Sequence, residues 1–383
     1  MGLKVLMIGT YPVQPGVVRG GVESATSALV PALARRDDID SVTVLRFHHG
    51  EAPTAYRRET PKVQVFYVRG QYRWRMTTRA YLDVRKARKL IAELKPDVVH
   101  GQEIGLNSDI AARCSRNCVV TVHGITYVET HLYHRASLRN TLRAKLIHDV
   151  ARRVLRRAKV VISISGYDAR ELSGMTRGAR VSIANPTAAE FFALAPSAPT
   201  GPRLLFAGGL IPLKNPLGLV NAFAEAHQRF PDARLALVGP QPDGEYLTLL
   251  RDRVATLGLT DCVDFVGMVD NERMLREIAA ARAVVLFSRQ ENAPTIIAQA
   301  MAAGKPVVAS RVGGVAEMVD DGATGFLVES EDEAALADRL ARVLDDEPLC
   351  GRMGRRAHEV ASARFAPDAI AELTVRAYQT ALN

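Results

Sequence analysis

The sequence predicts an α/β protein made of two Rossmann-like, doubly wound parallel-sheet domains that face a central cleft. Three observations predict this fold. The chain has 383 residues, more than one ordinary core accommodates. Apolar strand-like runs alternate with helical patterns along its length, and this alternation restarts after a proline-rich spacer at residues 195–202. Because doubly wound sheets bind ligands beyond the carboxyl ends of their strands, we expect the site in the cleft.

The first domain is expected over residues 1–185. Its first strand, Lys4–Gly9, is apolar at nearly every position, as a parallel strand covered on both faces should be. The loop that follows ends in Gly20-Gly21, before an amphipathic helix over Val22–Arg35. Further strands are expected at Val42–Phe47, Val63–Val68, Val98–His100, Val119–Val122 and Val160–Ser163, and helices at Arg79–Leu94 and Arg139–Arg157.

The second domain is expected over residues 186–366 and repeats the same rhythm. Its strands are expected at Arg203–Ala207, Arg234–Val238, Val263–Val266, Ala283–Phe287, Pro306–Ala309 and Gly325–Val328, each followed by a helical stretch. The remaining residues, 367–383, hold an amphipathic helix over Pro367–Leu382 that we expect to pack back on the first domain.

The net charge of +9 is unevenly divided, at +16 for residues 1–185 and −7 for the remainder. A basic half can meet nucleic acid, an anionic membrane surface or a phosphate-bearing substrate. We expect no nucleic acid, since the chain carries no aromatic ribonucleoprotein motif or helix-turn-helix pattern. No apolar run approaches the ~20 residues of a membrane span, and the start has no cleavage signal. A cytoplasmic protein is expected, with the inner face of the cell membrane as a second location.

The densest pattern in the chain runs from Ser288 to Ser310 and is typical of a loop, a helix, a tight turn and a buried strand. Helix N-termini attract anions, so the backbone at this helix start is expected to hold a phosphate or sugar hydroxyls. Its residues are Asn292, Ala293, Pro294 and Thr295. Glu291 can accept hydrogen bonds from vicinal hydroxyls or, alternatively, cap the helix. Gln299 follows eight residues later.

Three further sites follow predicted strands. His123 comes directly after an apolar strand and before Gly124, which places its ring at the carboxyl edge of the sheet. A purely structural histidine is the alternative. Gly20 and Gly21 supply backbone donors for a diphosphate or form a helix-capping turn. Gly208 and Gly209 lead to Lys214, whose ammonium can neutralise a diphosphate leaving group or stay exposed to solvent.

Taken together, these residues resemble the family-4 retaining glycosyltransferases of the GT-B fold. The strongest similarity is Glu291–Ser310, where the family has Glu-Gly-Phe-Gly, a second Glu eight residues after the first, and Ala-Met-Ala-x-Gly-x-Pro-Val-Val-Ala-Ser. The other similar segments are Gly20-Gly21-Val22-Glu23, Val122-His123-Gly124, Ser163–Leu172, Ile183–Phe192 and Gly313–Val319.

The resemblance implies a transferase that moves a hexosyl unit from a nucleotide-sugar donor to a glycan or lipid-linked acceptor. It implies that Glu291 holds hydroxyls of the transferred sugar, with the amides of residues 292–295 against it. Lys214 would bind the diphosphate, Gly21 would contact phosphate, and His123 would touch the sugar near the reacting carbon.

Two positions depart from the family pattern. The family's Gly-Arg-Leu is Gly208-Gly209-Leu210 here, so the diphosphate-binding Arg is missing, and Arg289 or Arg311 is a candidate to compensate. The second family Glu, which bonds the nucleotide ribose, is Gln299, which accepts a hydrogen bond without the assistance of charge. These departures leave a non-catalytic protein that binds sugar nucleotides or glycans as the alternative function.

No metal ion or cofactor is expected, because no Asp-x-Asp lies at a predicted strand end. The resemblance implies retention by front-face attack, with the leaving phosphate as base. The acceptor would bind the basic first domain. Arg69–Arg79 and the four arginines Arg152, Arg153, Arg156 and Arg157 favour an anionic bilayer or a lipid-phosphate acceptor, with a solvated basic face as the alternative. A nicotinamide dehydrogenase is disfavoured, because the first loop lacks Gly-x-Gly-x-x-Gly.

Overall fold

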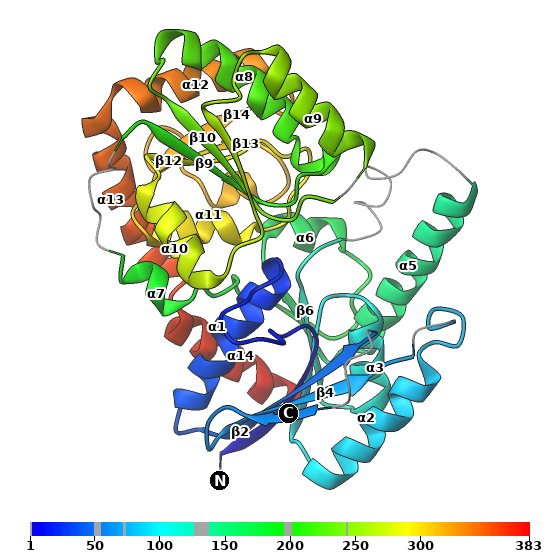
Figure 1. The fold of residues 1–383 in the computed structure, drawn as a ribbon. Helices are drawn as coiled ribbons and strands as arrows, with labels where there is room; N and C mark the ends of the chain where they lie inside the picture. Colours follow the sequence, from blue (N-terminus) through cyan, green and yellow to red (C-terminus); the bar gives the residue numbers. More distant parts are fainter. Residues whose placement is uncertain (1, 50–54, 72–73, 126–137, 195–200, 243) are drawn as a thin grey trace. The chain divides into compact units, whose positions relative to one another are not determined.

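The computed structural model describes residues 2–49, 55–71, 74–125, 138–194, 201–242 and 244–383. The chain divides into two compact units (Figure 1). The first contains residues 1–15, 21–186 and 367–383, and the second contains residues 16–20 and 187–366. Most of the spacer expected at residues 195–202 lies outside the described residues.

The first unit is built on an eight-stranded sheet with the order β3-β4-β2-β1-β5-β6-β7-β8. All neighbouring strands pair in parallel except β3 and β4, which are antiparallel. The strands are β1 (Leu3–Ile8), β2 (Ile39–His48), β3 (Ala55–Arg58), β4 (Val63–Arg69), β5 (Val98–Gln102), β6 (Cys118–Val122), β7 (Val160–Ser163) and β8 (Ala179–Ser182).

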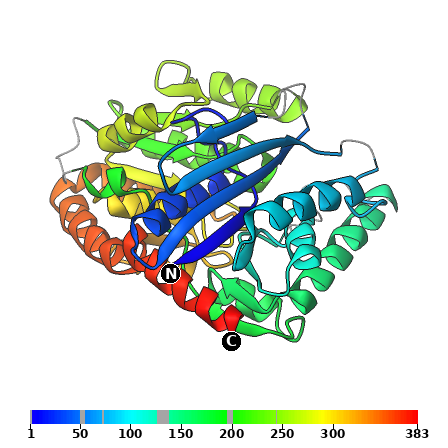
Figure 2. The same cartoon turned by 90° about the horizontal axis from the view of Figure 1, so that it is seen from below.

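Helices cover both faces of this sheet, as the alternation of side chains along β1 requires. Val5 and Met7 pack with α1 (Gly21–Arg35) and α14 (Pro367–Leu382) in one core cluster. Leu6 and Ile8 belong to the opposite cluster, with α2, α3 and α5. These three helices span Tyr81–Leu94, Leu106–Cys114 and Leu138–Arg157, and α6 spans Gly166–Glu171. Figure 2 shows α14 running beside α1.

The second unit has a six-stranded, fully parallel sheet with the order β11-β10-β9-β12-β13-β14. This is the order of a doubly wound nucleotide-binding sheet. The strands are β9 (Arg203–Ala207), β10 (Arg234–Val238), β11 (Val263–Gly267), β12 (Ala283–Leu286), β13 (Val307–Ser310) and β14 (Gly325–Val328).

The helices of the second unit also lie on both faces of its sheet (Figure 1). Helix α8 packs against α9 and α12, and α11 packs against α13. Their bounds, in chain order with the shorter helices, are α7 (Ala189–Phe192), η1 (Pro212–Lys214), α8 (Pro216–Arg229), α9 (Glu245–Thr256), α10 (Asn271–Ala280), α11 (Thr295–Ala302), η2 (Val315–Glu317), α12 (Glu333–Asp345) and α13 (Glu347–Arg364).

The predicted fold class is confirmed: both units are doubly wound α/β structures. The structure adds two edge strands that the sequence analysis does not predict, β3 and β8. It also groups the segment Gly16–Gly20 with the second unit and α14 with the first. None of the described helices combines the length and the apolar character that crossing a bilayer demands.

Candidate functional site

A partly buried ion pair marks the carboxyl edge of the second sheet. Lys214 ends the short turn η1 after β9, and Glu291 follows β12, the neighbouring strand. The ammonium nitrogen Nζ of Lys214 lies 2.5 Å from Oε1 of Glu291. The hydroxyl of Ser288 donates to the same carboxylate oxygen at 2.7 Å. Parallel strands end at the same edge, which is why residues 77 positions apart meet here.

Glycines bring the backbone close together around this pair. A Cβ atom at Gly313, whose φ is +51°, would lie 1.7 Å from the carbonyl oxygen of Glu291. A Cβ atom at Gly239, whose φ is +133°, would lie 2.1 Å from the carbonyl oxygen of Gly208. The backbone N–H of Gly208 donates to Val238 at 2.9 Å. Only glycine fits such approaches, so the loop after β9 is fixed against the loop after β10, and the loop after β12 against the loop after β13.

The helix after Glu291 begins later than the sequence analysis expects. Helix α11 starts at Thr295, and its N-cap residue is Pro294, which makes no side-chain cap hydrogen bond. Pro294 has no backbone N–H, so among residues 292–295 the backbone donors belong to Asn292, Ala293 and Thr295. Glu291 lies before the N-cap and pairs with Lys214, so the structure does not use it as the helix cap. Gln299 is half-buried on α11.

Of the two arginines considered as substitutes for the missing family Arg, Arg289 lies beside Lys214. Its guanidinium donates to the carbonyl oxygen of Pro212 at 2.8 Å and pairs with Glu331 at 2.6 Å. Its backbone N–H donates to Leu213 at 2.9 Å, on the same short turn that carries Lys214. Arg311 pairs with two carboxylates, those of Asp321 and Glu329. Gly209, where the family has its Arg, is partly exposed.

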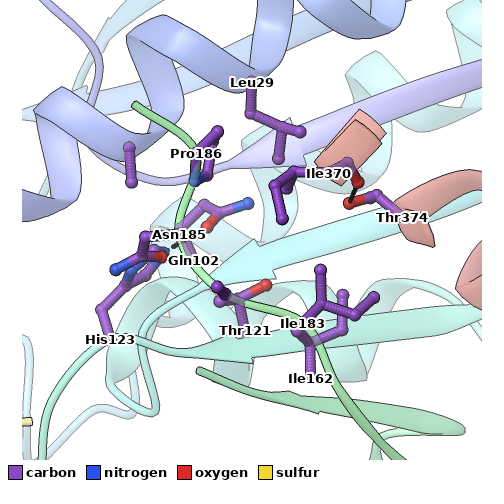
Figure 3. Close-up of a pocket in the computed structure, with 12 residues that line it drawn as sticks. Leu29, Gln102, Thr121, His123, Ile162, Ile183, Asn185, Pro186, Ile370 and Thr374 are labelled. Atoms are coloured by element: carbon purple, nitrogen blue, oxygen red, sulfur yellow. Dashed lines mark hydrogen bonds between the residues drawn. The ribbon is translucent and has the colours of Figure 1, made fainter. Parts of the chain in front are cut away.

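The first unit carries His123 at the carboxyl edge of its own sheet. The ring nitrogen Nε2 of His123, directly after β6, lies 2.5 Å from the carboxamide oxygen of Gln102, the last residue of β5. Figure 3 shows the two side chains close together at one side of a pocket that Asn185 also lines. Burial lowers the pKa of His123 to about 4, and a side-chain hydrogen bond with Asn185 acts in the opposite direction. The ring is therefore neutral near pH 7.

The loop that leads to Gly20 and Gly21 is held by side chains of the neighbouring strands. Arg46 of β2 donates to the carbonyl oxygen of Tyr11 and pairs with Glu23 of α1 at 2.5 Å. The hydroxyl of Tyr67 donates to the carbonyl oxygen of Pro12 at 2.6 Å. Gly20 has a φ of +99°, and Gly21 is the first residue of α1. A left-handed residue directly before a helix favours glycine at position 20.

The basic residues of the first unit are not all solvated. Arg153 and Arg157 of α5 lie 3.9 and 4.0 Å from the buried carboxylate of Asp109. Arg153 is half-buried, whereas Arg152, Arg156 and Arg157 are exposed. In the segment Arg69–Arg79, Tyr72 and Arg73 lie outside the described residues. Arg75 pairs with the buried Asp83 at 2.9 Å, so part of this positive charge is neutralised within the unit.

Two family descriptions match the chain and together take in most of it. "Glycosyltransferase Family 4" matches residues 19–186, and "Glycosyl transferases group 1" matches residues 189–360. The chain belongs to glycosyltransferase family 4.

Curated relatives of this family-4 glycosyltransferase include the D-inositol 3-phosphate glycosyltransferase of Streptomyces avermitilis. It is 39% identical over 185 residues, which are 47% of this chain and 40% of that protein. The N-acetyl-alpha-D-glucosaminyl L-malate synthase of Bacillus anthracis is 37% identical over 152 residues, 40% of this chain and 38% of that protein. Each match thus spans less than half of the curated relative.

Solved structures of the GT-B fold match along the whole chain. The sucrose-phosphate synthase of Thermosynechococcus elongatus has a TM-score of 0.80 at 24% identity and covers 98% of each chain. HepE of Anabaena, solved in complex with UDP-glucose, has a TM-score of 0.72 at 24% identity and covers 99% of this chain and 100% of that one. These likenesses support the GT-B fold of the glycosyltransferase.

Sequence reasoning missed Ser288, Gln102 and the residues behind Gln102. His100 and Gln102 lie two positions apart on β5 and are both buried. Polar residues at alternate positions of a strand that is covered on both faces were the available signal. The described residues contain no group of three or more His, Cys, Asp or Glu side chains that could hold a metal ion.

Proposed function

We propose that this family-4 glycosyltransferase moves a hexosyl unit from a nucleotide-sugar to a glycan or lipid-linked acceptor, with retention of configuration and without a metal ion. The observation that carries the proposal is the Lys214–Glu291 pair at the carboxyl edge of the second sheet. A cation beside a buried carboxylate suits a ligand that has a diphosphate at one end and hydroxyls at the other.

The donor would lie with its sugar against Glu291 and the backbone that follows it. The carboxylate of Glu291 accepts hydrogen bonds from two sugar hydroxyls, and the N–H groups of Asn292, Ala293 and Thr295 donate to the sugar or the phosphate. Glu291 is only 8% exposed, and Ser288 and Lys214 already fix its orientation. Such preorganisation lowers the cost of binding.

The diphosphate would lie against Lys214 and the partly exposed loop at Gly208 and Gly209. In the reaction, the acceptor hydroxyl attacks the anomeric carbon on the face from which the diphosphate departs. The carbon–oxygen bond to the phosphate breaks, and the hydroxyl proton passes to the leaving phosphate oxygen. The ammonium of Lys214 stabilises the negative charge that develops on that phosphate. Retention follows because attack and departure share one face.

Relatives of similar fold support a uridine nucleotide-sugar as the first donor to test. HepE has been solved with UDP, with UDP and glucose, and with UDP-glucose. We propose a UDP-hexose donor class on this basis. The sugar itself is to be chosen by a thermal-shift screen, in which a ligand at 100 times its Kd stabilises by about 2.7 kcal/mol.

The acceptor would bind the first unit, and we propose that this unit docks on the surface of an anionic bilayer. On α5, Leu142 is 59% exposed and Leu146, one turn later, is 40% exposed, and the basic Arg143 and Lys145 lie on the same helix. Apolar and basic side chains together suit an interface of anionic headgroups. Flotation with vesicles of phosphatidylglycerol tests this, and Leu142→Glu should abolish co-flotation. Recovery equal to that with phosphatidylcholine vesicles would contradict it.

The decisive experiment is transfer with the purified chain and a panel of nucleotide-sugars. Lys214→Met should lower kcat by roughly 10²–10³, the scale of one group that stabilises a developing oxyanion. Arg276→Met is the matched control, because Arg276 pairs only with Glu272 on the surface of α10 among the contacts described, and it should leave kcat unchanged. Equal rates for both variants would contradict the role of Lys214.

Two further measurements test the remaining parts of the proposal. The anomeric configuration of the product, read from its NMR coupling constants, should equal that of the donor. Activity should persist in chelator. Activity that is lost in chelator and returns with manganese would overturn metal independence.

A non-catalytic protein that binds sugar nucleotides is the second candidate, and Gly209 in place of the family's Arg favours it. Such a protein would show heat on titration with a nucleotide-sugar but release no nucleotide from it. Release of UDP from UDP-hexose in the presence of a glycan or lipid acceptor distinguishes the two functions.

A further inference from the structure

A chain of hydrogen bonds runs inward from His123 through the sheet of the first unit. Behind the His123–Gln102 contact, the carboxamide nitrogen of Gln102 lies 3.3 Å from Nε2 of His100. The ring of His100 in turn bonds the hydroxyl of Tyr378 through Nδ1 and the hydroxyl of Thr121 through Nε2, both at 2.8 Å. These hydrogen bonds therefore connect the carboxyl edge of the sheet to α14, which carries Tyr378.

These groups are closed off from solvent. Gln102 is 1% exposed, and His100 and Tyr378 are fully buried. A cavity of about 20 Å³ lies beside them, large enough for about one water molecule. Figure 3 shows Ile370 and Thr374 of α14 on the side of this cavity opposite His123. Buried polar groups that are hydrogen-bonded in this way hold one arrangement, because breaking any contact leaves a group unsatisfied.

The chemistry of the two groups decides where the proton of His123 resides. A carboxamide oxygen only accepts hydrogen bonds, so the imidazole nitrogen that faces it must carry hydrogen. Burial keeps His123 neutral near pH 7, as its lowered pKa of about 4 indicates, and a neutral ring carries one N–H. With the hydrogen on Nε2, the nitrogen Nδ1 has a lone pair and accepts hydrogen bonds.

We infer that Gln102 is a positioning residue for His123: its carboxamide oxygen holds the ring as the Nε2–H tautomer, and the His100–Tyr378 contact holds Gln102 in turn. The family resemblance implies that His123 touches the transferred sugar, and the ring would do so as this tautomer. It takes part by hydrogen bonding and does not act as a general acid or base. This assignment rests on the proposed function, because His123 is the residue of the first unit expected to touch that sugar.

Two neighbours support the position of Gln102. A Cβ atom at Gly9 would lie 2.6 Å from Cβ of Gln102, so Gly9 at the end of β1 leaves the space that this side chain needs. The rings of His100 and Tyr378 meet edge to face, with centroids 5.5 Å apart at 78°. Such a contact fixes the ring of His100 as well as its hydrogen bonds.

The test is the tautomer of His123, observed by long-range ¹H–¹⁵N correlation NMR of the ring nitrogens, without any donor. The wild-type chain should show the hydrogen on Nε2. Gln102→Met removes the acceptor oxygen at similar volume and should give a mixture of tautomers, whereas Gln102→Glu keeps an acceptor oxygen and should retain Nε2–H. With a nucleotide-sugar whose sugar the wild type transfers, Gln102→Met should lower kcat/KM roughly tenfold, which is the effect expected from the loss of one hydrogen bond.

Ile183→Val is the matched control, because Ile183 lines the same cavity without a polar side chain. It should reduce stability slightly and leave both the tautomer and kcat/KM unchanged. An Nδ1–H tautomer in the wild type, or an unchanged tautomer in Gln102→Met, overturns the inference. If neither the wild type nor any variant transfers a sugar, the proposed function fails. The tautomer measurements would still decide the role of Gln102.

Discussion

The α-carbon of Gly313 packs directly against the backbone of Glu291, so closely that a Cβ atom there would lie 1.7 Å from the Glu291 carbonyl oxygen. Gly313 also has a φ of +51°, a backbone conformation that residues with a side chain rarely adopt. Gly313→Ala should therefore displace Glu291 from Lys214 and weaken binding of a nucleotide-sugar at least tenfold, as calorimetry would measure. Gly322→Ala, at a φ of +77° with open space around it, is the control for strain alone. Unchanged affinity in Gly313→Ala would contradict the link to Glu291.

Gly209 leaves room for the arginine that the family carries. Its φ lies outside the left-handed region, and a Cβ atom there would meet only the side chain of Ile211, at 3.7 Å or more. Gly209→Arg should therefore fold normally and raise kcat by roughly tenfold or more, because a second cation would stabilise the departing diphosphate. Gly209→Gln fills the same space without charge and should show no gain. If kcat of Gly209→Arg is equal to or lower than that of Gly209→Gln, the cations already in the protein suffice to stabilise the departing diphosphate.

Two histidines with lowered pKa values should make the first unit sensitive to acid. Burial lowers the pKa of His123 to about 4 and that of His100 to about 3. Below about pH 6.5 the unfolded chain binds protons that the folded chain excludes, so these rings lower the free energy of unfolding as pH falls from about 6.5 to 4. Urea denaturation at about pH 7.5 and pH 5 should show a smaller loss for His100→Gln than for the wild type. An equal loss in both proteins would contradict this account.

Glu103 changes the free energy of unfolding with pH in the opposite direction to the two histidines. It follows β5 with a φ of +77°, and burial raises the pKa of its carboxyl to about 7, against the lowering effect of Arg75. The folded state retains this proton to higher pH than the unfolded chain, so the free energy of unfolding falls as pH rises from about 4.5 to 7. Glu103→Gln should stabilise the protein at about pH 8 by on the order of 2 kcal/mol. A Gln at this position can still accept the hydrogen bond that Asn107 donates at 3.1 Å.

The exposed Glu93 on α2 supplies the control for this prediction, since Glu93→Gln should leave the midpoint of urea unfolding unchanged at both pH values. The same experiment has a second expected outcome. Because Glu103→Gln removes the opposing contribution, the variant should lose more stability than the wild type on acidification to about pH 5. If Glu103→Gln is less stable than the wild type at about pH 8, the contacts of the Glu103 carboxylate stabilise the fold by more than the burial of its charge destabilises it.

Most strands could be predicted from sequence because each is a short, largely apolar run that must be covered on both faces. Strands β7, β9, β10 and β14 have the predicted bounds. The two missed strands lie at the edges of the first sheet, where one side lacks a neighbour. β3 reads Ala-Tyr-Arg-Arg and is mostly exposed, so no apolar run marks it. Edge strands commonly carry such charged residues, which hide them from a search for hydrophobicity.

The site was predictable only in part, since its contacts join residues far apart in the chain. Glu291 and Lys214 were each recognised from local motifs, but their pairing depends on β9 and β12 lying side by side in the sheet. The capping alternative for Glu291 depended on where α11 starts, and boundaries are the least certain feature of a sequence pattern. Tyr378 could not be linked to His100, which lies 278 positions earlier.

The packing of α14 bears on how the protein is made. Ile370, Val375 and Tyr378 belong to the same core cluster as Val5 and Met7 of β1. A ribosome synthesises the second unit before these residues, so the first unit emerges early but lacks one wall of its core until α14 has been made and has left the ribosome. For that interval, its apolar surface is open to chaperones and proteases.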